Sequence, residues 1–373
     1  MNINPYIGVL LNQKTINRLL KKQKLLKKNL KIYYLVERNK NMNTKLYFFS
    51  LKNIDYLQLR IKGTFYNWKK ERWEQRHFPF PDVFYNRVAK GLESKTTHII
   101  VFKRKLNELN VKQINPKHDF NKWELYEKLS KGRRGKIKLP KTVLFQEKES
   151  LNNMLKKYTS VYVKDVKGRR GKSVLKITKL NNGQFECKQF TSRVKTITLG
   201  NLDETLQYIK TIFTKKNFII QQAIQLETYK DAIFDMRAEV QRNGKGKLVV
   251  AGIPVRVAHS NSPVTSSRTK TNIFPFKQFF VNKLGYSTKQ YLDFNEKVTT
   301  FLENVYRSVE KKYGRFGELG IDFALDKKGN LWLIECNATS GKRAFIQAYD
   351  DQSIQNLQGN VLSYAKWLVR TNH

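Results

Sequence analysis

Two acidic side chains near the end of the chain, Asp322 and Glu335, are spaced so that a β-hairpin would bring them face to face. They lie in the segment ELGIDFALDKKGNLWLIECN, residues 318–337, in which apolar and polar side chains alternate on both sides of a polar turn. Asn337 shares the face of Glu335. Directly opposed carboxylates repel each other, and a divalent cation that prefers oxygen ligands would relieve that repulsion. The hairpin therefore predicts a metal site.

The facing of the two acids depends on the register of the hairpin. If Asp326 pairs with Leu331 across the turn, Asp322 pairs with Glu335. A slip of one residue would send one acid to the opposite face of the sheet. On this segment alone, the alternative of a surface hairpin with solvated acids stays open.

A second candidate site lies upstream, in the segment VYVKDVKGRRGKSVLKI. An apolar strand ends at Lys164 and is followed by a loop that contains Gly168 and Gly171. Glycines let the backbone approach a ligand closely, and free N–H groups flanked by cations can hold phosphate oxygens. The GxxxxGK[ST] spacing of a Walker loop is absent. An ordinary hairpin is the alternative.

Two further segments follow in order. NFIIQQAIQLETY has the pattern of a buried strand that leads to a hinge, whose backbone could hydrogen-bond an adenine edge. FDMRAEVQRNGKGKLVVAGIPVRVA predicts two strands joined by a glycine turn, with Arg237 on the first and Arg256 on the second. The planar fork of arginine suits phosphate or carboxylate groups. Either arginine could instead be a solvated strand residue.

The composition predicts a globular, strongly basic protein. The chain has 373 residues, of which 40% are apolar and 12% aromatic, enough for a substantial core. Its 72 Lys and Arg against 30 Asp and Glu give a net charge of +42, which attracts polyanions. These cations are spread along the chain and form no nucleic-acid-reading motif, so a general surface bias is the alternative.

The sequence also indicates the compartment. Cys187 and Cys336 fit no zinc or disulfide framework, which favours a reducing environment, and neither is expected to be a nucleophile. The N-terminus lacks the pattern of a signal peptide, and no run approaches the ~18 apolar residues of a membrane span. We expect a soluble, intracellular protein.

Breaks in the pattern predict three units, at residues 1–115, 116–215 and 216–373, in an α+β arrangement. In the first unit, residues 14–31 predict one basic helix, and residues 56–61 and 98–102 predict strands. The basic helix packs its leucines inward in one interpretation and contacts a membrane or nucleic acid in another. In the last unit, residues 288–313 predict a long helix.

The order of these motifs resembles the ATP-grasp superfamily. More narrowly, GVLLN, FPFPDVFYNRV, FNKWELYEKL, IIQQAIQL, FDMRAEVQ, GIPVRVA and the closing hairpin are similar to the YheC/YheD group of spore coat-associated proteins. The resemblance implies two α+β subdomains that clasp ATP, at 116–215 and 216–373, preceded by an N-terminal α/β domain of the kind that comes before ATP-grasp domains.

The resemblance also implies roles for individual residues. Contacts to the nucleotide phosphates, closure of the glycine loop over them and the lining of the adenine site would come from Lys122, Lys164, Gly168, Arg169, Gly171, Lys172, Ser173, Gln222, Ala223 and Ile224. Asp322, Glu335 and Asn337 would hold one or two Mg²⁺ ions, and Arg237 and Arg256 would stabilise the transferring phosphoryl group.

Two positions depart from the superfamily pattern. Asp165 follows Lys164 where proline is frequent, and Gly320 stands two residues before Asp322 where some relatives have arginine. We therefore expect nucleotide binding to be retained more readily than catalysis.

The function implied by the resemblance is an ATP- and Mg²⁺-dependent ligase that joins a carboxylate to an amine or a thiol through an acyl phosphate. Its substrates would be an anionic amino acid or a peptide, and its location the cytoplasm, in association with a spore coat layer. The alternative is a catalytically degenerate ATP-grasp protein that serves as a basic, polyanion-binding component of a spore layer, with an anionic polymer or spore-layer proteins as partners. A dedicated nucleic-acid binder is a third reading, which predicts steep salt dependence.

Overall fold

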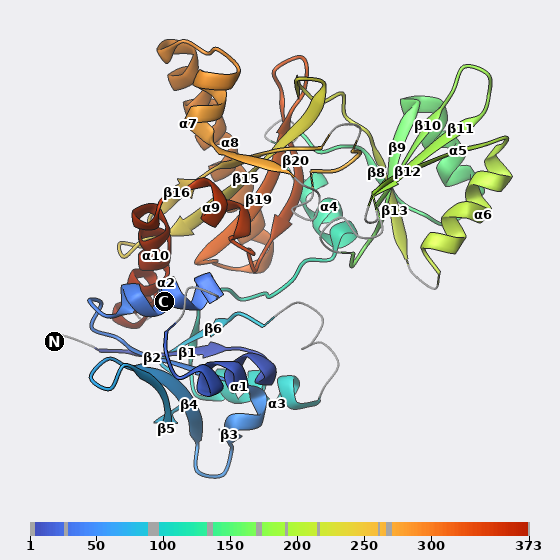
Figure 1. The fold of residues 1–373 in the computed structure, drawn as a ribbon. Coiled ribbons are helices and arrows are strands. Elements are labelled where there is room, and N and C mark those ends of the chain that lie inside the picture. Colours follow the sequence, from blue (N-terminus) through green and yellow to red (C-terminus); the bar gives the residue numbers. More distant parts are fainter. Residues whose placement is uncertain are drawn as a thin grey trace.

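The structure is a computed structural model of the chain that describes residues 4–25, 29–88, 97–132, 137–168, 174–190, 193–214, 217–259, 262–265 and 271–371. Three β-sheets with covering helices form three units (Figure 1). The predicted α+β class is confirmed. Within the described residues, no helix is both long enough and apolar enough to cross a membrane.

The first unit holds a sheet with strand order β3-β4-β2-β1-β6-β7, and β5 pairs with β4. Its strands are β1 (Tyr6–Leu10), β2 (Lys45–Phe49), β3 (Ile54–Asp55), β4 (Arg60–Asn67), β5 (Arg72–Pro79), β6 (Val83–Asn86) and β7 (Lys112–Gln113). Its helices are α1 (Gln13–Lys22), α2 (Leu30–Asn39), the 3₁₀ turn η2 (Leu51–Asn53) and α3 (Thr97–Glu108). The neighbours β2, β1, β6 and β7 are parallel, which requires helical crossovers between them.

Three predictions for this unit are wrong. Residues 14–31 do not form one helix: α1 ends at Lys22, because Gln23 takes a positive φ of 54° that an α-helix does not tolerate. Residues 98–102 lie in helix α3 rather than in a strand. The run HIIVF suits a strand, but Ile99, Phe102 and Leu106 are buried at helical spacing, and that period decides the structure. Residues 56–59 form turns before β4.

The second unit is a sheet with order β12-β11-β10-β9-β13-β8, in which all neighbours are antiparallel. Its strands are β8 (Thr142–Leu144), β9 (Ser160–Asp165), β10 (Val174–Lys179), β11 (Phe185–Phe190), β12 (Val194–Leu199) and β13 (Phe218–Gln222). Helices α5 (Lys148–Tyr158) and α6 (Leu202–Ile212) pack on this sheet, whereas α4 (Lys122–Ser130), which precedes β8, packs Leu125 and Leu129 into the core of the third sheet. Asn121 caps α4 by accepting hydrogen bonds from the N–H groups of Trp123 and Glu124, which confirms the predicted helix start.

The third unit is a sheet with order β18-β17-β15-β19-β20, and β14 and β16 also pair with β15. Its strands are β14 (Thr228–Tyr229), β15 (Ala232–Arg242), β16 (Leu248–Gly252), β17 (Pro254–Val257), β18 (Asn272–Pro275), β19 (Glu318–Leu325) and β20 (Leu331–Asn337). Its helices are α7 (Phe276–Gln278), the π-helical turn η3 (Phe279–Lys283), α8 (Thr288–Tyr313), α9 (Arg343–Ala348) and α10 (Asp351–Arg370). The long helix predicted at 288–313 is α8.

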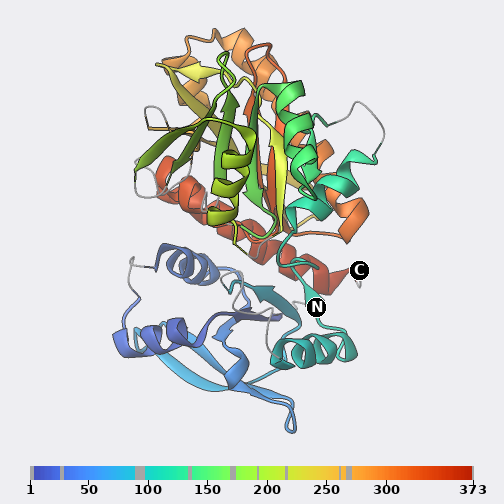
Figure 2. The same ribbon diagram turned by 90° about the vertical axis from the view of Figure 1, so that its right-hand side faces the viewer.

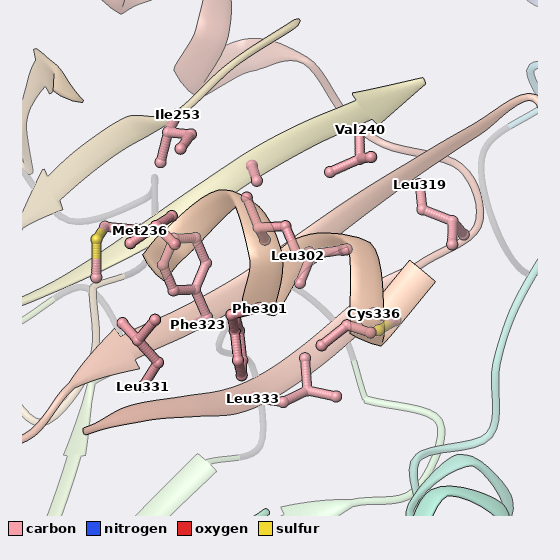
Figure 3. Packing of buried hydrophobic residues seen from close by; sticks show 14 of the residues in the cluster. Met236, Val240, Ile253, Phe301, Leu302, Leu319, Phe323, Leu331, Leu333 and Cys336 are labelled. Atoms are coloured by element: carbon pink, nitrogen blue, oxygen red, sulfur yellow. The ribbon is translucent and has the colours of Figure 1, made fainter. Parts of the chain in front are cut away.

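One face of this third sheet is apolar and the other is charged. Phe301 and Leu302 of α8 pack against Met236 of β15 and Phe323 of β19 on the apolar face (Figure 3). Because side chains alternate along a strand, the residues between these apolar ones point to the other face. The functional residues predicted on β15 and β19 are all on that charged face.

The last helix packs the end of the chain against the first unit. α10 packs against α2, and its residues Val361, Leu362 and Leu368 belong to the core of the first sheet (Figure 2). The chain therefore returns to its first unit after completing the third. The boundaries at 115/116 and 215/216 remain predictions.

A buried ion cluster joins the first sheet to the third. Glu318 of β19 is fully buried and accepts hydrogen bonds from the Tyr85 hydroxyl (2.7 Å) and from Arg87 Nη1 (3.0 Å). Its other carboxylate oxygen lies 2.6 Å from Lys342 Nζ. Burial alone would raise the pKa of Glu318, but Lys342 and Arg87 outweigh it and lower that pKa to about 2. The carboxylate is thus ionised and holds two buried cations.

Candidate active site

The register of the third sheet sets oppositely charged residues side by side. Asp235 of β15 pairs with Arg256 of β17, and Arg237 of β15 pairs with Asp322 of β19. Asp322 in turn pairs with Glu335 of β20. Because directly paired residues in a sheet point to the same face, these five side chains form a row across four strands.

The predicted pair of Asp322 and Glu335 is present, but the register of the hairpin that produces it differs from the prediction. Leu325, not Asp326, pairs with Leu331, so the register next to the turn is one residue away from the prediction. A β-bulge between Asp322 and Phe323 restores the expected pair by placing one extra residue, Ile334, on β20. Both Ile334 and Glu335 consequently line the same cavity.

Asp322 is neutralised by arginines. Arg237 donates two hydrogen bonds to its carboxylate, from Nε and Nη2, each of 2.6 Å, and Arg256 Nη2 lies 3.2 Å away. Asn337 Nδ2 donates to the same carboxylate at 3.3 Å. Burial would raise the pKa of Asp322, but the two guanidinium groups prevail and lower it. The acid is therefore ionised and paired.

Asp235 is a site residue that the sequence interpretation did not assign. Its carboxylate accepts Nε and Nη2 of Arg256 at 2.6 and 2.5 Å, and the Thr265 hydroxyl also donates to it. Arg256 and Asp235 are both almost fully buried. Burial would lower the pKa of Arg256, but Asp235 and Asp322 raise it. The signal in the sequence is the motif FDMR, because Asp235 and Arg237 stand two residues apart on one strand face.

The two predicted phosphate-binding lysines approach the same row from α4 and β9. Lys122 Nζ donates to the backbone oxygen of Gly168 (2.8 Å) and to Glu335 Oε1 (3.1 Å). Lys164 Nζ donates to Gln221 Oε1 at 2.5 Å. Burial lowers the pKa of Lys164 to about 8, the charge of Lys122 adds to the lowering, and Glu335 opposes it. Both lysines lie where an anion would stabilise their charge.

The predicted adenine segment is brought only partly into the cavity. Gln222 and Ile224 line it, but Ala223 does not, and the Ala223 N–H donates to the backbone oxygen of Ser160 (3.1 Å). The Gln222 side chain accepts from the Lys141 N–H at 3.2 Å. Of the predicted glycine loop, Gly168 lines the cavity, whereas Arg169, Gly171, Lys172 and Ser173 fall outside the described residues.

The charged row, both lysines, Gly168, Gln222 and Ile224 line one cavity of about 730 Å³. Its walls come from the first, second and third sheets, and its volume lies within the range of small-molecule sites. The cysteines take no part: both are buried, and burial raises the pKa of Cys187 to about 12 and that of Cys336 as well. The expectation that neither is a nucleophile agrees with this burial.

The donor set of the row fits magnesium bound together with phosphate. Asp322, Glu335 and Asn337 offer carboxylate and amide oxygens, and Mg²⁺ is usually held by one or two carboxylates plus substrate phosphates. Among the described residues, no group of three or more His, Cys, Asp or Glu side chains is placed to hold a metal ion. Asp322 and Glu335 are also already paired with cations. The protein side of the site is thus incomplete without a ligand's oxygens.

Magnesium is expected to bind only in the presence of nucleotide. Arg237 and Lys122 hold the carboxylates that a free ion would need, and phosphate groups would both draw these cations away and supply oxygens. Calorimetric titration of Mg²⁺ should therefore show no binding to the protein alone and one or two ions with a non-hydrolysable ATP analogue present. Stoichiometric binding to the protein alone would contradict this.

The fold defines the class of protein. The structure superposes on VanG D-Ala:D-Ser ligase from Enterococcus faecalis with a TM-score of 0.55, at 11% identity over 98% of this chain and 100% of that one. It also matches the ATP-grasp ligase PsnB in complex with a minimal precursor, with a TM-score of 0.53, at 12% identity over 96% of this chain and 99% of that one. At such low identity these likenesses show a shared fold, the ATP-grasp fold.

The sequence places the chain more narrowly. The profile of the family described as YheC/D like ATP-grasp matches residues 110–368, and the chain belongs to this family. It is 25% identical over 301 residues to the endospore coat-associated protein YheD of Bacillus subtilis. That match covers 80% of this chain and 64% of the length of YheD. The resemblance to the YheC/YheD group is confirmed.

Proposed function

We propose that the protein is an ATP- and Mg²⁺-dependent ligase that joins a carboxylate to an amine. The observation that carries the proposal is the row in the third sheet, where Asp322 and Glu335 lie between two arginines and the lysines of the second unit in a single cavity. The neighbours VanG and PsnB, described as ligases, support the reaction class.

In this proposal the second unit binds the nucleotide. Lys122 and Lys164 contact the phosphates, Gly168 lies beside them, and Gln222 and Ile224 line the base. Asp322, Glu335 and Asn337 would hold magnesium, which neutralises phosphate charge when bound. Gly168 is already linked to the third unit through Lys122 and Glu335, so phosphate binding and the acidic row are coupled.

The arginines then serve the transferring phosphoryl group. Arg256 is fixed by two hydrogen bonds to Asp235, which in turn accepts from Thr265, so its guanidinium has little freedom. A guanidinium that is positioned in advance in this way stabilises developing negative charge without reorganising. Arg237 pairs with Asp322 in the free protein and would turn to the phosphate oxygens when magnesium takes that carboxylate. We assign Arg237 and Arg256 this catalytic role.

The bond changes balance as follows. A carboxylate oxygen of the first substrate attacks the γ-phosphorus, and the bond from that phosphorus to the β–γ bridging oxygen breaks, which releases ADP and leaves an acyl phosphate. The amine nitrogen then attacks the acyl carbon, phosphate leaves, and the nitrogen loses a proton to give the amide. A thiol in place of the amine would give a thioester. Positioning and charge neutralisation supply most of the rate.

The test is ADP release in the presence of candidate substrates. Pools of amino acids, peptides and spore-forming cell extract should raise ADP release by the wild-type protein and leave Asp322→Asn at background. Lys148→Met, which changes a lysine of α5 that pairs with Asp203 and does not line the cavity, serves as a control that should behave as wild type. If no pool raises ADP above the Asp322→Asn level, the ligase proposal fails.

The affinity for ATP should fall as pH rises above about 8. Lys164 has its pKa lowered to about 8 in the free protein, and bound phosphate raises it, so binding takes up a proton above that pH. The dissociation constant should then grow by up to about tenfold per pH unit. In Lys164→Arg, which stays charged, the dependence should be nearly flat. Fluorescence titration of a labelled ATP between pH 7 and 9.5 measures this, and equal slopes in the two proteins would contradict it.

A second candidate role is supported by the charge. The net charge of +42 favours contact with an anionic polymer, and the relative YheD is described as endospore coat-associated. We propose a cytoplasmic protein that associates with a spore coat layer, whether it acts there as a ligase or as a basic structural component. The structural role becomes the preferred one if substrate pools leave ADP release unchanged.

A further inference from the structure

The cavity has a second arm, on the side of the first sheet. There β1 and β6 are parallel neighbours. After β1 the chain forms α1 and α2, which pack on one face of the sheet, and the helix that follows β6, α3, packs on the other. In open parallel sheets, ligands bind in the crevice at the carboxyl ends of two such strands. Leu11 and Arg87, which follow β1 and β6, both line the cavity.

The first-unit walls of this arm carry no acid. One part of them is apolar and consists of buried side chains on or next to β1, α2 and β2, namely Val9, Leu11, Ile32, Leu35 and Phe48. The other part is polar or basic, namely Asn12, Thr15, Asn29, Lys31, Tyr85 and Arg87. The acids that line the cavity in the described part of the chain are Asp165, Asp235, Asp322 and Glu335, all from the second and third sheets. An ammonium group placed in the arm would therefore lose its hydration without gaining a carboxylate partner.

A buried glutamine of α10 lines the cavity without a hydrogen-bond partner among the described residues. Gln358 of α10 is 2% exposed and lines the cavity, yet its side chain makes no hydrogen bond to any other residue that the structure describes. Buried polar groups are almost always hydrogen-bonded, so an amide left unpaired at a cavity wall indicates a ligand with a complementary group. Arg87, which donates to the backbone oxygen of Ser340 at 2.9 Å, lies between this arm and the loop after Asn337.

We propose that this arm holds the acid substrate of the proposed ligase, and that this substrate is a carboxylic acid with an apolar body and no free ammonium group. An N-acylated apolar amino acid, or an N-terminally blocked peptide that ends in an apolar residue, has this chemistry. Its carboxylate would reach the arginine row, its side chain would pack against the apolar side chains of the arm, and its amide would pair with Gln358. The inference rests on the proposed function for the orientation of the substrate, with its carboxylate toward the arginine row. Binding measurements alone can test whether the arm holds such an acid.

The probe is N-acetyl-leucine, in both enantiomers, titrated calorimetrically into the protein with Mg²⁺ and a non-hydrolysable ATP analogue. We expect at least one enantiomer to bind about tenfold more tightly than free leucine and than N-acetylglycine, which lacks the apolar side chain. Gln358→Leu should weaken that binding about tenfold. Gln355→Leu, the same change three residues earlier on α10 at a position that does not line the cavity, should leave it unchanged.

Two results would overturn the assignment: free leucine binding as tightly as N-acetyl-leucine, or equal affinities in Gln358→Leu and wild type. Leu35→Phe, which fills the arm from α2, gives a second test, because it should abolish probe binding while affinity for the ATP analogue persists. Retained probe binding in Leu35→Phe would also contradict the proposal. If the probe binds as expected but never raises ADP release, the arm stands as an acid-binding site and the ligase proposal is the part that fails.

Discussion

Replacing Glu335 by glutamine is expected to weaken Mg²⁺-dependent binding of ATP by about 100-fold or more. Residues that only support a metal ligand already change metal affinity by about 10–100-fold, and Glu335 is assigned as a ligand itself. The substitution keeps the size of the side chain and removes its charge. Calorimetric titration of ATP at saturating Mg²⁺ measures the effect.

For the same variant we expect the opposite effect on ATP binding when Mg²⁺ is removed, and this serves as the control. Glu335 holds Lys122 at 3.1 Å, so its neutral replacement frees that cation for phosphate. In the presence of EDTA, Glu335→Gln should bind ATP as well as wild type or better. A variant that loses affinity equally with and without Mg²⁺ would show that Glu335 acts structurally, and would remove it from the metal site.

Replacing Glu318 by alanine is expected to lower the free energy of unfolding by about 3–5 kcal/mol. The change leaves Arg87 and Lys342 buried without their shared carboxylate, and an unpaired buried charge has a cost of that size. Because the cluster joins the first and third sheets, the loss should appear in the main unfolding transition. Urea unfolding followed by tryptophan fluorescence gives the value.

An exposed ion pair of the same length provides the matched control. Lys148 and Asp203 are also 2.6 Å apart, but their side chains are 40% and 66% exposed, so Asp203→Ala should cost at most about 1 kcal/mol. The contribution of Glu318 should also depend on pH. With a pKa lowered to about 2 from 4.5, its stabilisation is complete above about pH 4.5 and is lost as the pH falls toward 2. Equal costs for the two variants would contradict the role of burial.

Features set by local pattern could be predicted from the sequence. The helix α8 has the predicted bounds, since a capping residue, a long apolar stripe and a glycine end define it. Alternation on both sides of one turn predicts the pairing of Asp322 with Glu335, although the register next to the turn differs by one residue and the β-bulge that restores the pair is not predicted. Each of these features depends on residues close together in the chain.

Features set by distant contacts could not be predicted. The segment that contains Ile99 reads as a strand until its burial at helical spacing in the first unit is known. The motif FDMR places Asp235 on the strand face of Arg237, but its pairing with Arg256 depends on β17, which lies beside β15 only in the folded sheet. Gln358 stands in an ordinary amphipathic helix, and only the return of α10 to the first sheet places its amide at the cavity. Sheet order and chain return are decided by long-range packing, which local periodicity does not record.

The origin of the oxygen atoms in the released phosphate tests the ligase proposal most directly. The reaction is run in water enriched in oxygen-18 with the substrate pool that raises ADP release, and the phosphate is examined by phosphorus NMR. A ligase that forms an acyl phosphate passes a carboxylate oxygen to phosphate. We therefore expect the released phosphate to carry no oxygen-18 and to equal the released ADP in amount. Phosphate that carries one oxygen-18 atom for every ADP released would show simple hydrolysis of ATP by water and would contradict it.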